Sequence, residues 1–260
     1  MVTWLSWGQR GEGNWIYAKR FDSSGSPQSD NFLVSDNPAD YQEIPSLVEA
    51  EDLEFESEPE QINIAGDENG NFVIVWVFEN EDSRGIRARL YDNTAKPKSE
   101  IFQVNTEEDV QGEISVSMNN AGDFIISWMG ESGDGNVFAK VYNSSGEVRI
   151  SDFQVSNYPK LKQGYPSAGI DEDGSFVIAW ETGVSEGGQS QDGDKTGISA
   201  RRFNADGIAS GDEFQVNQHW RDWQEETGAA IHNGLFVVTW MSTEVDGDAD
   251  DISARLFNDS

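Results

Sequence analysis

The chain repeats one pattern of apolar and polar positions. An apolar run that ends in tryptophan recurs with small changes, as in "FVIVW", "FIISW", "FVIAW" and "FVVTW". The five tryptophans at this position are Trp4, Trp76, Trp128, Trp180 and Trp240. Their spacings of 72, 52, 52 and 60 residues indicate a basic unit of about 52 residues, with insertions in two copies. Self-similarity at a fixed period of this length is typical of repeat architectures.

Each unit contains four short segments of strand-like composition, which we call A, B, C and D. In one unit they read "YPSAGID", "FVIAW", "ISARRFN" and "EFQVN". Turns such as "DEDGS" separate A from B, and Asp, Asn and Gly accept the positive φ that a tight hairpin turn requires. Segment B is apolar on both faces, as expected for a strand that is covered on both sides. In the second unit, "QEIPSLVEA" at 42–50 is the predicted segment A.

This pattern predicts an all-β fold of the β-propeller type, with four-stranded antiparallel blades. A blade buries its two faces only by stacking on its neighbours, which explains why the sequence repeats. Repeated β-sandwich domains are the alternative, although an Ig-like sandwich needs about 100 residues and seven strands. We expect a single domain over 1–260 with about 4.5 to 5 units. The units are placed at 1–35, 36–105, 106–156, 157–217 and 218–260, with an acidic insertion at 51–60.

The first unit begins at segment B, and the last unit ends after segment C. The sequence leaves open whether five blades close into a ring with imperfect end blades or belong to a longer array. Since incomplete blades expose strand edges that can pair, self-association through the terminal blades is a further expectation.

The negative charge of the chain disfavours some classes of binding partner. The net charge is −31, from 48 acidic and 17 basic residues. Such a surface repels nucleic acid phosphate and anionic lipid, so we expect no nucleic acid partner. Because no apolar run approaches the roughly 20 residues that span a bilayer, we also expect no membrane insertion. The absence of cysteine excludes disulfides and thiolate metal sites.

The acidic loops between segments B and C are the candidate metal sites. Carboxylates at alternate positions around a turn can coordinate calcium. The best match is "DGDADD", with Asp246, Asp248 and Asp250, and the second is Asp192 with Asp194. Both lack a downstream bidentate glutamate, so an acidic hairpin loop without metal is the alternative. Calcium is the predicted cofactor.

Aromatic residues outside the repeat are the candidate ligand-binding residues. Trp7 and Trp15 flank "GQRGEGN", and Trp220 and Trp223 flank Arg221 in "HWRDW". Aromatic side chains on loops can stack on a sugar or dock on a protein. Local capping of a blade is the alternative.

A basic residue in segment C occurs in every unit. A catalytic residue is needed once, so a residue that recurs five times is better explained as an ion pair or a backbone clamp between neighbouring strands. The five residues are Lys19, Arg89, Lys140, Arg201 and Arg255.

Taken together, the segments resemble a repeat of large secreted bacterial proteins that carry haemolysin-type calcium-binding or cadherin-like modules. The resemblance is carried by "NGLFVVTW", "DGDADDISARLFN" and "GDEFQVN" and covers nearly the whole chain. It implies an extracellular or cell-surface location and a role in adhesion, and it names no ligand.

No catalytic motif is present. The chain has two histidines, His219 and His232, and lacks the G-x-S-x-G and H-E-x-x-H patterns. Carboxylates are too abundant for a glycosidase pair to be chosen. We therefore predict that the chain is not an enzyme but a calcium-stabilised, non-catalytic binding or adhesion module. It would recognise a carbohydrate or a protein surface through its rim loops. The alternatives are a structural subunit of an extracellular filament or surface layer, and a polysaccharide-acting enzyme on a propeller scaffold.

Overall fold

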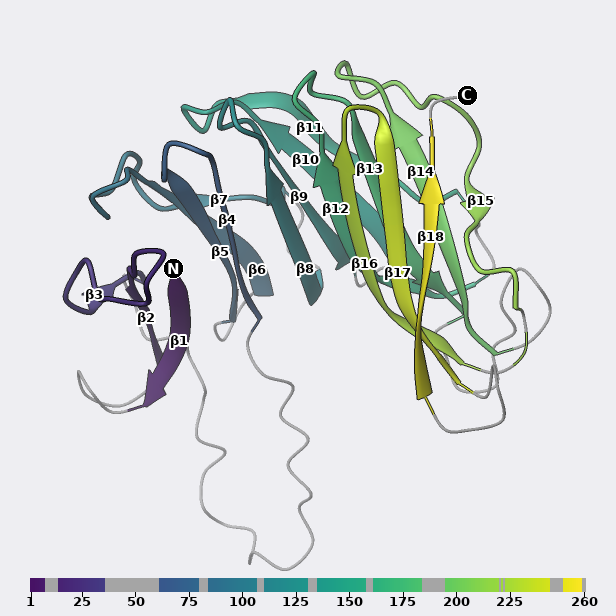
Figure 1. Cartoon of the computed structure of the whole chain (residues 1–260), viewed down its shortest axis with the longest axis horizontal. Helices are drawn as coiled ribbons and strands as arrows, with labels where there is room; N and C mark the ends of the chain where they lie inside the picture. The colour runs from purple at the N-terminus through teal and green to yellow at the C-terminus, as the bar shows by residue number, and fades with distance from the viewer. Residues whose placement is uncertain are drawn as a thin grey trace, which may run out of the picture.

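The structure is a computed structural model, and every regular element in its described part is a β-strand. The described residues are 1–7, 14–35, 61–79, 84–106, 110–130, 135–157, 161–183, 195–219, 221, 223–243 and 250–258. The strands form five antiparallel sheets that fan out one after another along the chain (Figure 1). We call these sheets blades 1 to 5.

Consecutive strands make up each blade. Blade 1 contains β1 (Val2–Trp7), β2 (Asn14–Lys19) and β3 (Phe32–Leu33). Blade 2 contains β4 (Ile62–Gly66), β5 (Phe72–Glu79), β6 (Arg84–Tyr91) and β7 (Phe102–Gln103). Blade 3 contains β8 (Val110–Met118), β9 (Phe124–Gly130), β10 (Asn136–Tyr142) and β11 (Val148–Gln154). Blade 4 contains β12 (Gln163–Ile170), β13 (Phe176–Thr182), β14 (Gly197–Phe203) and β15 (Phe214–Gln215). Blade 5 contains β16 (Gln224–His232), β17 (Leu235–Thr243) and β18 (Asp250–Phe257).

Within blades 2 to 4 the strands pair in chain order, which is the predicted order of segments A, B, C and D. In the described residues, blade 1 has the counterparts of B, C and D, and blade 5 has those of A, B and C. The predicted all-β, propeller-like fold with four-stranded antiparallel blades is confirmed. A β-sandwich would instead pair two sheets around one core, whereas here the middle blades each pack on a neighbour on both sides.

Segment A of the second unit lies elsewhere than predicted. The predicted segment, 42–50, lies outside the described residues. Strand β4 takes this role, because it pairs with β5 and leads directly into the turn at Asp67. The similarity of "QEIPS" to "QGYPS" favoured the earlier segment, but a hairpin requires the strand adjacent to the turn.

The A strands lie side by side where the blades converge, and their small side chains permit this approach. Ser115 Oγ of β8 accepts a hydrogen bond from the Ala168 amide of β12 at 3.2 Å. Ser167 Oγ of β12 accepts one from the Ala229 amide of β16 at 2.9 Å. The inner strands of blades 3, 4 and 5 are therefore joined by serine side chains rather than by a shared β-ladder.

Gly169 lies where two inner strands, β12 and β16, approach each other closely. A Cβ added there would lie 3.1 Å from the Cα of Ala230, which is backbone and cannot rotate away. We expect Gly169→Val to lower the free energy of unfolding by about 2–3 kcal/mol, since it forces β12 and β16 apart. Gly211→Val is the matched control because a Cβ at Gly211 meets nothing within 4 Å. Urea titrations of both variants check this, and equal losses would contradict it.

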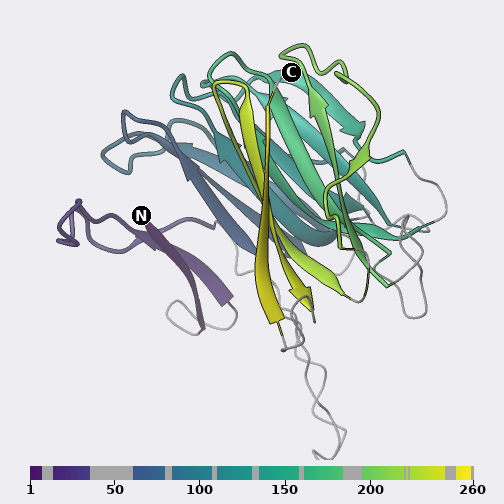
Figure 2. The same cartoon turned by 45° about the vertical axis from the view of Figure 1, so that its right-hand side comes forward.

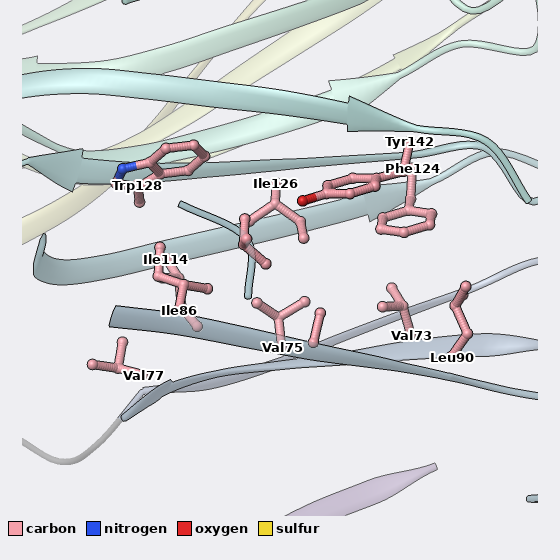
Figure 3. Close-up of a cluster of buried hydrophobic side chains, with 12 residues drawn as sticks. Val73, Val75, Val77, Ile86, Leu90, Ile114, Phe124, Ile126, Trp128 and Tyr142 are labelled. Atoms are coloured by element: carbon pink, nitrogen blue, oxygen red, sulfur yellow. The ribbon is translucent and has the colours of Figure 1, made fainter. Parts of the chain in front are cut away.

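Hydrophobic cores fill the spaces between neighbouring blades. Between blades 2 and 3, Val73, Val75 and Ile86 face Ile126 and Trp128, and all five are buried (Figure 3). Similar clusters join blades 1 and 2, blades 3 and 4, and blades 4 and 5. The B strands of blades 2 to 4 thus contribute alternate side chains to two different cores, which explains why their sequences are apolar on both faces.

The Ser or Asn at the end of segment D accepts a hydrogen bond from a buried backbone amide of segment C. The last residue of segment D accepts a hydrogen bond from the backbone amide of the first apolar residue of segment C in the same blade. These buried acceptors are Ser35, Asn105, Ser156 and Asn217. The repeat therefore keeps Ser or Asn here because a buried amide without a partner would be costly.

The recurring basic residue is a backbone clamp, as predicted, and in blades 3 to 5 it reaches the preceding blade, whereas Arg89 Nε donates to the Ser99 carbonyl of its own blade at 3.2 Å. Lys140 Nζ donates to the Val104 carbonyl of the preceding blade at 2.8 Å. Arg201 and Arg255 make the equivalent bonds, to the carbonyls of Val155 at 3.1 Å and Val216 at 2.9 Å. A charged donor thus ties each C strand of blades 3 to 5 to the end of the preceding blade.

Candidate functional site

Three neighbouring inner strands carry a β-bulge at the same end. The pairing register shifts between Gly112 and Ser115 in β8, between Gly164 and Ser167 in β12, and between Glu225 and Gly228 in β16. A bulge re-aims side chains and is common beside active sites. This end of the inner strands is opposite to the A–B turns.

The bulges hold non-glycine residues in the left-handed region. The φ angles of Glu113, Tyr165 and Glu226 are 51°, 49° and 58°. Such angles are uncommon for residues other than glycine and are retained where the surrounding structure enforces them. Because all three occupy the same place in their blades, they project from one end of the fold.

Glu181 lies beside these bulges and is a buried acidic residue. It stands at the end of β13, opposite Gly164 in β12, and is only 3% exposed. The equivalent positions of blades 2, 3 and 5 hold Val77, Met129 and Met241. A carboxyl group has thus replaced an apolar core side chain at one blade. We define the bulge-end cluster as Glu113, Tyr165, Glu181, Glu225 and Glu226.

The environment of Glu181 favours its neutral form. Burial raises its pKa to about 8, and the nearby negative charges of Glu225, Glu226 and Glu113 add to this. The hydrogen bond that its Oε1 accepts from the Glu226 amide, at 2.6 Å, acts in the opposite direction. At neutral pH the side chain is therefore a carboxylic acid that holds a proton.

The other members of the cluster differ in exposure and so in chemistry. Glu226 is exposed, whereas Glu113 and Glu225 are half-buried. Burial, followed by the charges of Glu226 and Asp250, raises the pKa of Glu225. Glu113 Oε2 accepts a hydrogen bond from Gln61 Nε2 at 3.1 Å. The cluster thus combines one protonated acid with carboxylates that reach solvent, which is the requirement for general acid–base catalysis.

Tyr165 adds an aromatic surface to the same end. Its side chain is 39% exposed, and its backbone carbonyl accepts a hydrogen bond from Thr227 Oγ1 of blade 5. An exposed aromatic ring can stack on the apolar face of a sugar. Blades 3, 4 and 5 therefore all contribute to the bulge-end cluster.

The predicted ligand-binding residues do not form one group in the described part. Trp223 is 39% exposed just before β16, with Lys195 Nζ 5.3 Å from its ring centroid. Arg221 is exposed, and its carbonyl accepts a hydrogen bond from Gln224 Nε2 at 3.1 Å. Trp220 lies outside the described residues.

The other predicted pair lies in blade 1. Trp7 ends β1, and the half-buried Trp15 is in β2. Blades 1 and 5 are far apart (Figure 1), so Trp15 and Trp223 belong to different surfaces. A role for these residues stays a prediction.

The predicted calcium loops fall mostly outside the described residues. This holds for Asp192, Asp194, Asp246 and Asp248. Asp250 is exposed at the start of β18 and accepts a hydrogen bond from Thr243 Oγ1 at 3.2 Å. Among the residues that the structure describes, no three His, Cys, Asp or Glu side chains are grouped as metal ligands would be. Calcium binding stays a prediction.

Sequence reasoning missed the bulge-end cluster. The chain has 48 acidic residues, and nothing in their number distinguishes Glu181 from the others. The available signal was the departure from the repeat, "FVIAWE" where other units read "FVIVWV" or "FVVTWM". Only the fold shows that this glutamate is buried and that glutamates from two other blades lie near it.

Comparisons with known proteins find similarity in structure only. No protein-family model matches the chain, and no curated protein sequence is similar enough to count as a match. Among solved structures, an endo-arabinase from Bacteroides thetaiotaomicron is 11% identical, with a TM-score of 0.48 over 99% of this chain and 90% of that one. A GH43 endo-arabinanase from Bacillus licheniformis is 11% identical, with a TM-score of 0.42 over 98% and 89%. An α-L-arabinanase from Penicillium chrysogenum is 14% identical, with a TM-score of 0.43 over 69% and 58%.

These comparisons correct two of our predictions. The named structures are carbohydrate-active enzymes, which is at odds with a non-catalytic adhesion module and with the prediction that the chain is not an enzyme. They agree better with the alternative of a polysaccharide-acting enzyme. Because the identities and TM-scores are low, any activity of this chain has to be inferred from its own residues.

The described residues were compared with the requirements for a membrane-spanning helix. They include no helix with the length and apolar character needed to cross a bilayer.

Proposed function

We propose that the chain is a polysaccharide-acting hydrolase whose active site is the bulge-end cluster. The observation that carries this proposal is Glu181, a buried carboxyl group that keeps its proton at neutral pH beside carboxylates that reach solvent. Glycoside hydrolysis uses such a pair, in which one carboxylic acid protonates the leaving oxygen and a carboxylate acts on the other side of the sugar.

The roles within the cluster follow from burial. Glu181 acts as the general acid, with Oε1 held by the Glu226 amide and the proton on Oε2. Glu225 or Glu226 acts as the carboxylate, either activating water or attacking the sugar carbon. Tyr165 supplies the aromatic surface on which a sugar ring stacks. The anomeric configuration of the product distinguishes the two roles of the carboxylate, because activation of water inverts it and direct attack retains it.

The finer predictions on setting and ligands fit this proposal. We propose an extracellular location, which the resemblance to secreted bacterial repeat proteins supports, and a carbohydrate as the partner. A calcium ion bound at Asp250, at the start of β18, would stabilise the fold without entering the reaction.

The test is reducing-sugar release from a panel of neutral and acidic polysaccharides that includes arabinan. With the best substrate, Glu181→Gln should lower kcat/KM by about 10²–10⁴-fold, the range for loss of a general acid. Glu100→Gln removes the same charge at an exposed position of blade 2 and should leave kcat/KM unchanged.

A second substrate identifies the role of Glu181. A dinitrophenyl glycoside of the same sugar has a leaving group that needs no proton. Glu181→Gln should therefore keep a kcat/KM for it close to that of the wild type, because kcat/KM reports the steps up to departure of the leaving group. Release of sugar from no member of the panel, or equal losses on both substrates, would contradict the assignment.

A further inference from the structure

The outer surface of blade 5 is an apolar sheet face that no described element covers. Ile252 is 80% exposed, Leu256 68% and Leu235 49%. Val237 pairs with Leu256, and Met241 pairs with Ile252, across β17 and β18. These five residues, which we call the terminal face, lie on β17 and β18 of blade 5, which is the last sheet of the fan along the chain (Figures 1 and 2).

The repeat shows what such a face is built to contact. The residues at the position of Ile252 in blades 1 to 4 are all 0% exposed. They are Ile16, Ile86, Val137 and Ile198. In blade 4, Ile198 and Val177 are covered by Val238 and Trp240 of blade 5. The tryptophan-bearing side of a following blade is therefore what packs on this surface, four times within one chain.

Blade 1 presents a matching surface at the other end of the fan. Trp4 and Val2 stand at the positions of Trp240 and Val238, and Val2 is 50% exposed. In the described part of the chain, each hydrophobic cluster joins two consecutive blades and none joins blade 5 to blade 1, so the two surfaces do not meet within one chain.

We propose that the terminal face binds the Trp4 side of blade 1 of a second copy of this chain. The contact continues the blade-to-blade interface, with Val2 and Trp4 lying over Ile252 and Leu256. Such an interface is heterologous, joining the end of one copy to the beginning of the next, and adds copies until a ring closes or a filament grows. It is independent of the proposed activity, because the bulge-end cluster is not part of it.

Charge gives this association a recognisable salt dependence. Each copy carries a net charge of −31, so two copies repel one another at low ionic strength. The screening length falls from about 10 Å at 0.1 M salt to about 3 Å at 1 M. Since the contact itself is apolar, added salt should strengthen it, whereas an interface made of ion pairs would weaken.

Sedimentation velocity of the full chain at 0.1 M and 1 M NaCl tests the proposal. We expect oligomers that increase with concentration and salt. Ile252→Lys and Val2→Lys should each be monomeric, because each blocks one of the two surfaces. Ile208→Lys, at a 64% exposed isoleucine between β14 and β15, is the matched control and should assemble like the wild type.

Mixing the two blocked variants identifies the pairing. Ile252→Lys keeps an intact blade 1, and Val2→Lys keeps an intact terminal face, so the mixture should form a dimer that neither forms alone. A wild type that stays monomeric at 1 M salt would overturn the proposal. So would self-association of Val2→Lys alone, which would mean that two terminal faces pair with each other.

Discussion

Replacing Glu181 by glutamine is expected to stabilise the protein at pH 8 by roughly 4 kcal/mol while it lowers the proposed activity on polysaccharide. The reason is that the folded protein holds this carboxyl group with a pKa of about 8, against an ordinary value of 4.5. Glutamine has nearly the same shape, and its Oε1 can still accept the bond from the Glu226 amide, but it never ionises.

The sign of the pH dependence follows from the raised pKa. Below pH 4.5 the carboxyl group is protonated in both the folded and the unfolded chain, so it costs nothing. Between pH 4.5 and about 8 the unfolded chain loses the proton and the folded chain keeps it, so stability falls by about 1.4 kcal/mol per pH unit. Above pH 8 the full cost is present.

Urea unfolding of the wild type and Glu181→Gln at pH 5, 6, 7 and 8 measures this difference. The gap between the two proteins should widen with pH, and Glu100→Gln should show no such widening. A gap of the same size at pH 5 and pH 8 would mean that Glu181 is ionised in the folded protein, and the proposed acid would be lost with it.

Trp180→Ala is expected to lower the free energy of unfolding by about 3–5 kcal/mol. Trp180 is 0% exposed in the core between blades 3 and 4, where it packs with Ile125 and Val137. The substitution leaves a cavity between two sheets that are also held by the Arg201 clamp, so the core cannot collapse to fill it.

Trp4→Ala is the matched control because Trp4 occupies the same position of the repeat. Trp4 belongs to blade 1, is half-buried, and stacks on Tyr17 with ring centroids 6.1 Å apart. No blade precedes it in the described part, so the monomer should lose only about 1–2 kcal/mol. Urea unfolding at low salt and low concentration compares the two, and equal losses would show that burial between blades does not set the cost.

The bulge-end cluster and the terminal face both arise where one copy of the repeat departs from the others. At Glu181 the departure is chemical, since a carboxyl group occupies an apolar position. At Ile252 the side chain follows the consensus and only its surroundings differ. The first therefore affects stability through pH, and the second affects assembly through the concentrations of protein and salt.

The repeat by itself determined the architecture. Alternating apolar residues in segment B must be covered on both faces, so stacked sheets were the physical consequence, and the clamp role of Lys140 followed from its recurrence. The predicted position of segment A in the second unit was wrong, because a sequence similar to segment A in another unit does not show which strand pairs with β5 across the turn.

Only the tertiary structure decided the candidate site. The burial of Glu181, the bulges that aim Glu113 and Glu226, and the convergence of blades 3 to 5 depend on residues up to a hundred or so positions apart. A local pattern cannot report the dielectric surroundings that set a pKa, because these come from side chains on other strands. For the same reason, the aromatic residues that stand out from the repeat drew the prediction of a binding site, while the glutamate that matters chemically went unnoticed.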